Sequence, residues 1–517
     1  MRRPYESILQ ISLDIPIPSV YILFNPFPNI RRCVLKRILS ISLVVILSLS
    51  GMAGAQSLRD NPRVGEAIRL LELWLDAQRA YEEIPGISIS VVHDQEMVWS
   101  AGFGYADIEK KIPTTSKTIY SICSISKLFT SISVMQLRDA GKLRLDDHID
   151  QILPWFTIKQ AYPDSPPITV KGLLTHSAGM PRESAHPYWT GPDYPFPTRE
   201  EMIKELSGQK TWYPAFERFQ YSNLGMSILG EVVAQVSGQD YATYVKEHIL
   251  DPVELVDTQP KLPDGAKKNR LALGYSSMTR QGVRVPLNTF QAGGIAPAAG
   301  FSSTAEDLGK FASWQFRVLE NKDNAILHVH TLKEMQRVNW VDPDWKTSWG
   351  LGFSVSRNKD RTFVGHGGSC PGYQTQLKLN PKDKIAVVVM ANASGVNTGK
   401  FAQQAYDIFA PAIAEALDTT KTAKVPPEKL KEYLGTYGSQ PFGGEMAVFI
   451  WKGQLATVRF PSDEPLERIT KWKHVEGDRF IQDRKDGATG MDMVFERDAE
   501  GKVFRIKRNN NYSTKMW

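Results

Sequence analysis

Cysteine is scarce in this chain, with three among 517 residues. One of them, Cys33, lies in the N-terminal leader described below, so Cys123 and Cys370 remain. Two cysteines cannot build the disulfide framework that stabilises small secreted domains. Because free cysteine is usually buried and inert, we expect both side chains to pack in the core, with a disulfide or a reactive thiol as the alternatives.

A strong excess of charge is also missing. The chain has 62 Lys and Arg against 56 Asp and Glu, a formal charge of +6. Residues 1–55 hold six basic and two acidic residues, so their net charge is +4 and the rest of the chain carries +2. Without a basic run there is no electrostatic basis for binding nucleic acid. We therefore expect a small-molecule or peptide substrate as the partner; the sequence indicates no oligomeric state.

Long hydrophobic runs are absent after the first 55 residues. The leader itself has basic residues, an apolar stretch from Ile38 to Leu49, and the small residues Ala53-Gly54-Ala55. This layout is typical of a secretory signal peptide, and the apolar stretch is short for a membrane span. We predict export to the periplasm or beyond after cleavage near Ala55/Gln56, without stable membrane insertion of the mature chain. An uncleaved anchor is the alternative.

The pattern of apolar residues predicts an α+β fold. Residues 64–83 have helical spacing, and residues 87–107 alternate as two strands around a turn at Asp94-Gln95. A helix follows Ser124, further helices follow residues 168–181 and Tyr221, and successive strands fill residues 351–394. A closing helix covers residues 401–417. Helices at both ends of a run of antiparallel strands indicate a sheet flanked by helices, together with an all-helical region.

The composition changes at residues 419–428, a polar stretch with Pro426-Pro427 that is typical of a linker. Beyond it the chain is almost entirely short alternating strands separated by turns, which predicts a small all-β, barrel-like domain. The predicted organisation is a leader at 1–55, a hydrolase domain at 56–418, a linker at 419–428 and a C-terminal domain at 429–517.

A serine followed three residues later by a lysine is a candidate nucleophile and proton acceptor. The spacing occurs three times, as Ser124/Lys127, Ser207/Lys210 and Ser356/Lys359. Only Ser124 precedes an amphipathic helix, where free backbone N–H groups and the helix dipole favour developing negative charge. Lys127 projects from the same helical face, and burial can lower its pKa until it accepts a proton. A polar helix start with a surface lysine is the alternative.

Two later motifs favour the catalytic interpretation. Tyr221 and Asn223 flank a serine, so a phenol that relays protons and an amide that holds a substrate carbonyl lie close together. His366-Gly367-Gly368-Ser369 follows in a strand, where glycine allows a substrate backbone to approach.

The three motifs occur in the order that serine β-lactamases and penicillin-binding proteins use. Residues 64–415 resemble the class C β-lactamase type of serine hydrolase, which includes D-Ala-D-Ala carboxypeptidases, D-aminopeptidases and some esterases. The stretches "ITVKGLLTHSAGMP", "YSNLGMSILGEVV", "APAAGFSSTAEDLGKF" and "GHGGSCPGYQT" also resemble the family's landmark stretches, in order.

The resemblance implies a role for each motif residue. Ser124 is the nucleophile, Lys127 and Tyr221 transfer protons, and Asn223 positions the substrate. His366 and Gly368 replace the family's Lys-Thr-Gly motif on an edge strand of the sheet, where they bind substrate. The backbone N–H groups of Ser124 and Ser369 form the oxyanion hole. No metal or cofactor is expected.

Histidine at position 366 departs from the β-lactamase form, in which a lysine supplies a fixed positive charge. Its ordinary pKa predicts a change of charge near pH 6.5 and therefore a KM for acidic substrates that rises between about pH 6 and pH 8. A histidine there is closer to the peptidase branches, and the missing Ser-Asp-Asn motif is unlike class A.

Three other features have simpler interpretations. His328 and His330 lack nearby carboxylates and are not expected to hold a metal. His176 is expected to be structural. Ser369 is not expected to be a lipase-like nucleophile, because Pro371 stands where the Gly-x-Ser-x-Gly motif requires its last glycine.

We therefore expect an exported serine acyl hydrolase that acts on amide or ester carbonyls through an acyl-enzyme, with a D-amino-acid peptide, a β-lactam or a related compound as substrate. The alternatives are a carboxylesterase on the same scaffold and a penicillin-binding sensor that acylates without turnover.

Overall fold

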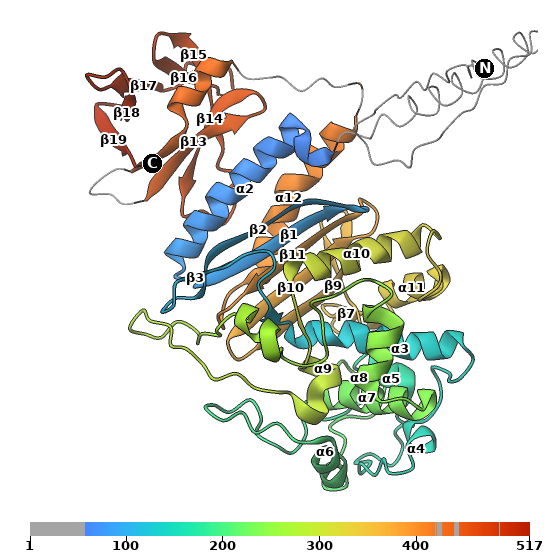
Figure 1. Cartoon of the computed structure of the whole chain (residues 1–517). Coiled ribbons are helices and arrows are strands. Elements are labelled where there is room, and N and C mark those ends of the chain that lie inside the picture. The colour runs from blue at the N-terminus through green and yellow to red at the C-terminus, as the bar shows by residue number, and fades with distance from the viewer. Residues whose placement is uncertain (1–56, 419, 421–426, 439–443, 485, 517) are drawn as a thin grey trace, which may run out of the picture. The chain divides into compact units, whose positions relative to one another are not determined.

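A nine-stranded antiparallel sheet lies at the centre of the structure (Figure 1). In this computed structural model the described residues are 57–418, 420, 427–438, 444–484 and 486–516. The predicted leader and most of the predicted linker lie outside them. The strand order is β3-β2-β1-β11-β10-β9-β8-β7-β6. The bounds are β1 Gly86–His93, β2 Glu96–Asp107, β3 Ile112–Pro113, β6 Trp340–Val341, β7 Ser348–Trp349, β8 Ser354–Asn358, β9 Arg361–Cys370, β10 Tyr373–Asn380 and β11 Ile385–Ala391.

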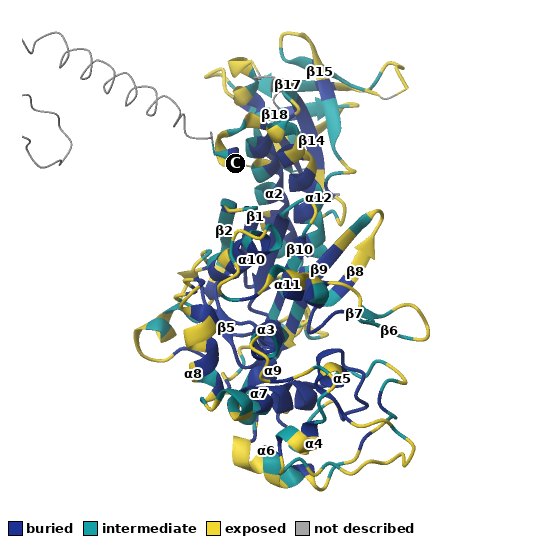
Figure 2. Ribbon diagram, turned by 90° about the vertical axis from the view of Figure 1, so that its right-hand side faces the viewer, coloured by how far each residue is buried: buried dark blue, intermediate teal, exposed yellow. Residues whose placement is uncertain are grey.

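The middle of the sheet is buried on both faces, which explains why β11 is a continuous apolar run. Val387 and Val389 face one apolar cluster, and Val388 and Met390 face another. Because successive side chains of a strand point to opposite faces, one strand serves both cores. Figure 2 shows this buried centre.

Two long helices, α2 (Pro62–Tyr81) and α12 (Thr398–Leu417), cover one face of the sheet. Asn61 caps α2 by accepting a hydrogen bond from the Arg63 N–H, and Pro62 occupies the first turn. The other face is covered by α10 (Ala305–Leu319). Its capping residue is Thr304, which accepts from the Asp307 N–H. The stretch Ser303-Thr304-Ala305-Glu306 has the spacing of a capping box, which would predict Ser303 as the cap. Ser303 instead belongs to the short strand β5 (Ser302–Ser303).

A helical region packs beside this layer, around α3 (Ser126–Asp139). It contains α4 Ile149–Ile152, α5 Val170–Leu174, α6 Arg199–Leu206, α7 Asn223–Ser237, α8 Tyr241–Val245, α9 Ala296–Ala299 and α11 Val329–Gln336. The predicted apolar stripe of α3 is only part of its buried surface, because the polar residues Thr130 and Ser133 are buried too. They bond to the backbone oxygens of Pro297 and Phe129, so their burial leaves neither hydroxyl unsatisfied.

The C-terminal region forms the predicted barrel, which is closed and eight-stranded. Its strands are β12 Gly435–Gly438, β13 Glu445–Trp451, β14 Gln454–Phe460, β15 Thr470–Glu476, β16 Arg479–Gln482, β17 Asp492–Arg497, β18 Val503–Arg508 and β19 Asn511–Lys515. The apolar side chains Phe449 and Val458 share a core cluster with α2 and α12. Glu66 on α2 also accepts hydrogen bonds from the N–H groups of Lys452 and Gly453, at 2.7 and 2.9 Å.

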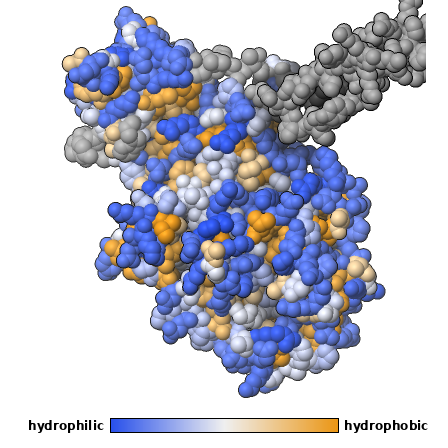
Figure 3. Space-filling model, viewed as in Figure 1, coloured by the Kyte–Doolittle hydropathy of each residue, from blue (hydrophilic) through white to orange (hydrophobic). Residues whose placement is uncertain are grey.

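The face drawn in Figure 3 is mostly hydrophilic, and its hydrophobic residues lie in separate small patches. Within the described ranges, no helix combines the length and the apolar character that crossing a bilayer requires.

Candidate active site

Ser124 lies in a short 3₁₀ turn, Cys123–Ile125, that leads directly into α3. The turn begins with Cys123 in the left-handed region, at a φ of 49°. A non-glycine residue there costs about 1–3 kcal/mol, so surrounding contacts must hold it. One of these is covalent, because Cys123 forms a disulfide with Cys370 on β9. The expectation of two unbonded, packed thiols was wrong.

The disulfide connects two segments that both carry predicted site residues. Cys123 precedes Ser124, and Cys370 follows Ser369, with 5.8 Å between the two Cα atoms. Both cysteines are buried. Sequence reasoning gave this disulfide only as an alternative, because 247 residues separate the two cysteines and their pairing depends on where β9 meets the start of α3.

Lys127 is fully buried in the first turn of α3, and its Nζ has three polar neighbours. Nζ lies 3.2 Å from Ser124 Oγ, 2.7 Å from Asn223 Oδ1 and 2.8 Å from the backbone oxygen of Ala298. The last two atoms can only accept hydrogen bonds. A neutral amine therefore gives its two hydrogens to them and turns its lone pair toward Ser124.

The surroundings of Lys127 favour this neutral form. Burial is the main cause that lowers the pKa of its amine well below the ordinary value. The carboxylate of Glu183 works against this shift, and the guanidinium of Arg182 adds to it. Lys127 therefore has the position and the lowered basicity that a proton acceptor for Ser124 needs.

Tyr221 and Asn223 are placed by the start of α7. Ser222, between them, caps this helix by accepting from the Gly225 N–H at 2.7 Å. Lys127 Nζ lies over the Tyr221 ring, 4.8 Å from its centroid. Burial raises the pKa of the Tyr221 phenol, and its hydrogen bond with the Ser124 side chain opposes the shift. At neutral pH Tyr221 is thus a proton donor, whereas Lys127 is the better acceptor.

His176 packs against Tyr221 and bonds to the backbone of this loop. Its ring packs 4.4 Å from the Tyr221 ring, and its Nδ1 accepts from the Ser222 N–H at 3.2 Å. Burial holds the pKa of His176 well below its ordinary value, so the ring stays neutral and can accept this bond. These contacts agree with the structural role expected for His176.

Glu183 is a site residue that sequence reasoning missed. Both of its carboxylate oxygens accept from Nδ2 of Asn223, at 2.9 Å each, and Tyr188 also donates to it. Both polar atoms of the Asn223 amide are therefore engaged inside the protein, rather than open to a substrate carbonyl as predicted. The stretch "GMPRES" contained no signal for this, because Glu183 is 40 residues from Asn223 in sequence.

His366 is buried on β9, and its Nδ1 donates to the backbone oxygen of Gly367 at 2.5 Å. Its ring lies against Trp349 and Tyr221, with centroids 5.4 and 6.2 Å apart. Burial is the main cause that lowers the pKa of His366 to about 3, and Lys127 adds to the shift whenever its amine is protonated. The ring is thus neutral from pH 6 to pH 8. The expected change of charge near pH 6.5 was wrong, because that expectation took an exposed histidine as its reference.

Gly368 lies very close to two other segments of the same chain. A Cβ atom there would lie 2.3 Å from the Ile122 backbone oxygen and 2.2 Å from Thr375 Oγ1. The space that the sequence assigned to a substrate backbone is therefore occupied on this side by the segment leading to Ser124. Glycine is required so that β9 can pack against that segment.

The second half of β9 has one open side. In the sheet order β9 lies between β10 and β8, so the first half of β9 is an inner strand and not the predicted edge strand. Its pairing with β8 covers Arg361 to Gly365, whereas its pairing with β10 continues to Cys370. Among the described strands, the stretch from His366 to Ser369 therefore has a neighbour on one side only. An extended substrate can lie along the other side.

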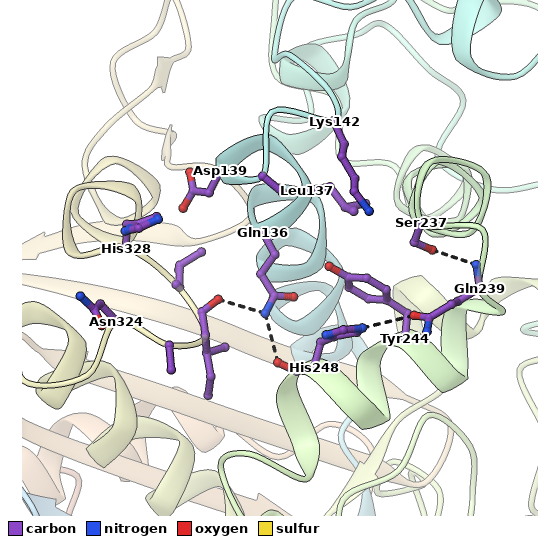
Figure 4. Close-up of a pocket in the computed structure, with 14 residues that line it drawn as sticks. Gln136, Leu137, Asp139, Lys142, Ser237, Gln239, Tyr244, His248, Asn324 and His328 are labelled. Atoms are coloured by element: carbon purple, nitrogen blue, oxygen red, sulfur yellow. Dashed lines mark hydrogen bonds between the residues drawn. The ribbon is translucent and has the colours of Figure 1, made fainter.

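The rival serines lie apart from these residues. Ser207 is the C-terminal cap of α6, and Ser356 is exposed on β8. Within the described ranges, no group of three or more His, Cys, Asp or Glu side chains could hold a metal ion. A pocket of about 520 Å³ at the end of α3 is lined by Gln136, His248 and His328, among others, and by none of the predicted site residues (Figure 4).

The comparison with known families agrees with this geometry. The family model described as Beta-lactamase matches residues 73–410. The chain belongs to the β-lactamase family. "Beta-lactamase-like protein 2" of Dictyostelium discoideum is 26% identical over 477 residues, which are 87% of this chain and 82% of that protein.

Solved structures share the fold of this β-lactamase family member. The octameric penicillin-binding protein homologue from Pyrococcus abyssi matches with a TM-score of 0.57 and 26% identity, over 87% of this chain and 100% of that chain. D-amino acid amidase from Ochrobactrum anthropi SV3 matches with a TM-score of 0.54 over 69% of this chain and 99% of that chain. At 21% identity, the amidase demonstrates a shared fold only.

Proposed function

We propose that this protein is a serine acyl hydrolase that cleaves amide or ester bonds through an acyl-enzyme at Ser124. The observation that carries the proposal is the position of the buried Lys127 amine, 3.2 Å from Ser124 Oγ with its two other contacts limited to acceptors. Membership of the β-lactamase family supports hydrolase chemistry in general.

Acylation uses the groups already described. Ser124 Oγ attacks the substrate carbonyl carbon, and its proton passes to neutral Lys127. The bond between the carbonyl carbon and the leaving group then breaks, and the leaving group takes a proton from the Tyr221 phenol. Protonated Lys127 then returns a proton to the phenol. In deacylation, water gives a proton to the same pair as it attacks the ester carbon, and Ser124 recovers its proton.

The oxyanion formed in each step needs backbone donors. We propose the N–H groups of Ser124 and Ser369 for this role, because the disulfide between Cys123 and Cys370 holds their chain segments together. Asn223 then acts mainly on Lys127, through Oδ1, and His366 contributes a neutral imidazole ring beside Tyr221.

Covalent labelling tests the nucleophile. Ser124→Ala should abolish turnover and labelling by a fluorophosphonate or penicillin probe. Loss of the nucleophile lowered kcat by about 10⁶ in one serine hydrolase. The matched controls Ser207→Ala and Ser356→Ala remove serines with the same spacing to a lysine and should leave both measurements unchanged. Labelling that persists in Ser124→Ala would disprove the assignment.

Export and substrate identity extend this proposal. We propose that the mature protein begins near Gln56, and N-terminal sequencing of protein recovered outside the cytoplasm tests this. Rates on a D-amino-acid amide, a chromogenic cephalosporin and a p-nitrophenyl ester, measured side by side, distinguish peptidase, β-lactamase and esterase activity. An acyl-enzyme that persists for hours without product would identify a penicillin-binding sensor instead.

A further inference from the structure

A pocket of about 370 Å³ shares a wall with the candidate active site. It is lined by Pro181, Arg182, Glu183, Ser184, Gly208, Gln209, Lys210 and Trp212. The shared wall is the segment Pro181–Glu183, because Glu183 also accepts from the Asn223 amide. A group bound in this pocket would thus lie beside the residues that surround Ser124.

The wall is fixed to the catalytic loop by backbone hydrogen bonds. Asn223 N–H donates to the Arg182 carbonyl oxygen at 2.7 Å. Ser222 Oγ donates to the Pro181 carbonyl oxygen at 2.6 Å. The position of Arg182 relative to Tyr221 is therefore set by the start of α7.

Arg182 has two N–H groups at this position that no other described residue uses. Its guanidinium lies over the Tyr221 ring, 5.0 Å from the centroid, and its Nε lies 3.1 Å from Glu183 Oε1. Among the described residues, neither Nη atom has a hydrogen-bond partner, and the side chain is 53% exposed. The two Nη groups are thus available to a ligand, and a planar guanidinium suits the two oxygens of a carboxylate.

The charge balance of the pocket is positive. Lys210 adds a second cation, and no described residue forms an ion pair with it. The one carboxylate in the lining, Glu183, is already engaged by Asn223, Tyr188 and Arg182. The exposed ring of Trp212 supplies an apolar surface for the carbon part of a ligand.

We propose that this pocket is a subsite for an anionic group of the substrate, a carboxylate in the first instance, and that Arg182 is its main contact. The proposal rests on the serine hydrolase function proposed above. It also accounts for a substitution in the site, since neutral His366 stands where related enzymes have a lysine. The positive charge that recognises an acidic substrate is supplied by the segment between α5 and α6 instead of by strand β9.

Matched substrate pairs test the proposal. One pair places the carboxylate on the acyl side, as p-nitrophenyl hydrogen glutarate against p-nitrophenyl valerate. The other places it on the leaving group, as a carboxyphenyl ester against the phenyl ester of the same acid. Arg182→Gln should lower kcat/KM for the charged member of at least one pair about tenfold or more relative to its neutral partner. This ratio cancels the effect of Arg182 on the pKa of Lys127, which both members share. Added salt should weaken the difference.

Arg218→Gln is the control variant. Arg218 is also a half-exposed cation over a tyrosine ring, 4.5 Å from the centroid of Tyr213, and it is not part of the pocket lining. It should change both members of each pair equally. Equal effects of Arg182→Gln on the charged and neutral members of both pairs would overturn the subsite.

A binding measurement separates failure of the subsite from failure of the proposed function. Calorimetry of glutarate binding to Ser124→Ala requires no turnover, and adding Arg182→Gln should weaken this binding at least tenfold. Unchanged binding overturns the subsite even if ester hydrolysis through Ser124 is intact. The opposite result is also informative. If glutarate binding depends on Arg182 but no probe labels Ser124 in the wild-type protein, the anion site stands and the proposed hydrolase function is wrong.

Discussion

Asn223 donates its amide Nδ2 to both carboxylate oxygens of Glu183, at 2.9 Å each. This fixes the orientation of the amide, because a flipped Asn223 would place its oxygen against a carboxylate and its NH₂ against the Lys127 amine. Oδ1 consequently faces Lys127 at 2.7 Å. In the proposed mechanism, Glu183 therefore acts on Lys127 through Asn223, as a positioning residue.

Removing the charge of Glu183 should shift the pH profile of catalysis. Its carboxylate raises the pKa of Lys127, so Glu183→Gln should lower that pKa and move the rising limb of kcat/KM to lower pH. We expect kcat to fall about tenfold, because the amide is held less firmly. Arg182 has the opposite effect on the pKa of Lys127, so Arg182→Gln should move the limb to higher pH. Shifts in the same direction would contradict this assignment.

The neutral His366 predicts a flat response to pH. Since its pKa is lowered to about 3, the ring does not change charge between pH 6 and pH 8. The ratio of KM values for an acidic substrate and its neutral analogue should vary by less than about twofold over this range, whereas a titrating group with pKa 6.5 would change it progressively. Steady-state kinetics in one buffer series measures the ratio. A ratio that rises through pH 6.5 would show that His366 is charged below that pH.

The disulfide between Cys123 and Cys370 should support both stability and activity. It closes a loop of 247 residues and connects the segments of Ser124 and Ser369. Cys123→Ser combined with Cys370→Ser should lower the free energy of unfolding by about 2–5 kcal/mol and reduce kcat. A reductant should have the same effect on the wild-type protein and no further effect on the double variant. Alkylation of both cysteines in denaturant, without prior reduction, would exclude the bond.

Contacts between α2 and the barrel should stabilise the protein without affecting chemistry. Glu66→Ala leaves the N–H groups of Lys452 and Gly453 without their carboxylate acceptor, and it removes the ion pair with Arg63. We expect the free energy of unfolding to fall by about 1–3 kcal/mol in urea titrations, with kcat unchanged. Glu72→Ala, on the same helix but more exposed, is the control and should change it by less than about 0.5 kcal/mol. Equal effects would mean that these barrel contacts contribute nothing measurable.

Local patterns were enough to predict most elements of the fold. The helical spacing in residues 64–83 predicted α2, and the alternation on either side of Asp94-Gln95 predicted the β1–β2 hairpin. The short alternating strands after residue 429 predicted the barrel, which is closed. These features follow from side-chain period and turn residues, which are properties of neighbouring positions in the sequence.

The sequence by itself also determined which serine to examine, because the spacing of Ser124 and Lys127 at a helix start is a local property. Only the tertiary structure decided how the site works. Glu183, the Ala298 carbonyl oxygen and the Cys123–Cys370 bond all join segments that are distant in sequence. The neutrality of His366 and the packing of Gly368 against Ile122 likewise depend on what surrounds β9. A residue type sets its ordinary pKa and size, whereas burial and neighbouring charges, which folding alone supplies, set the values that chemistry uses.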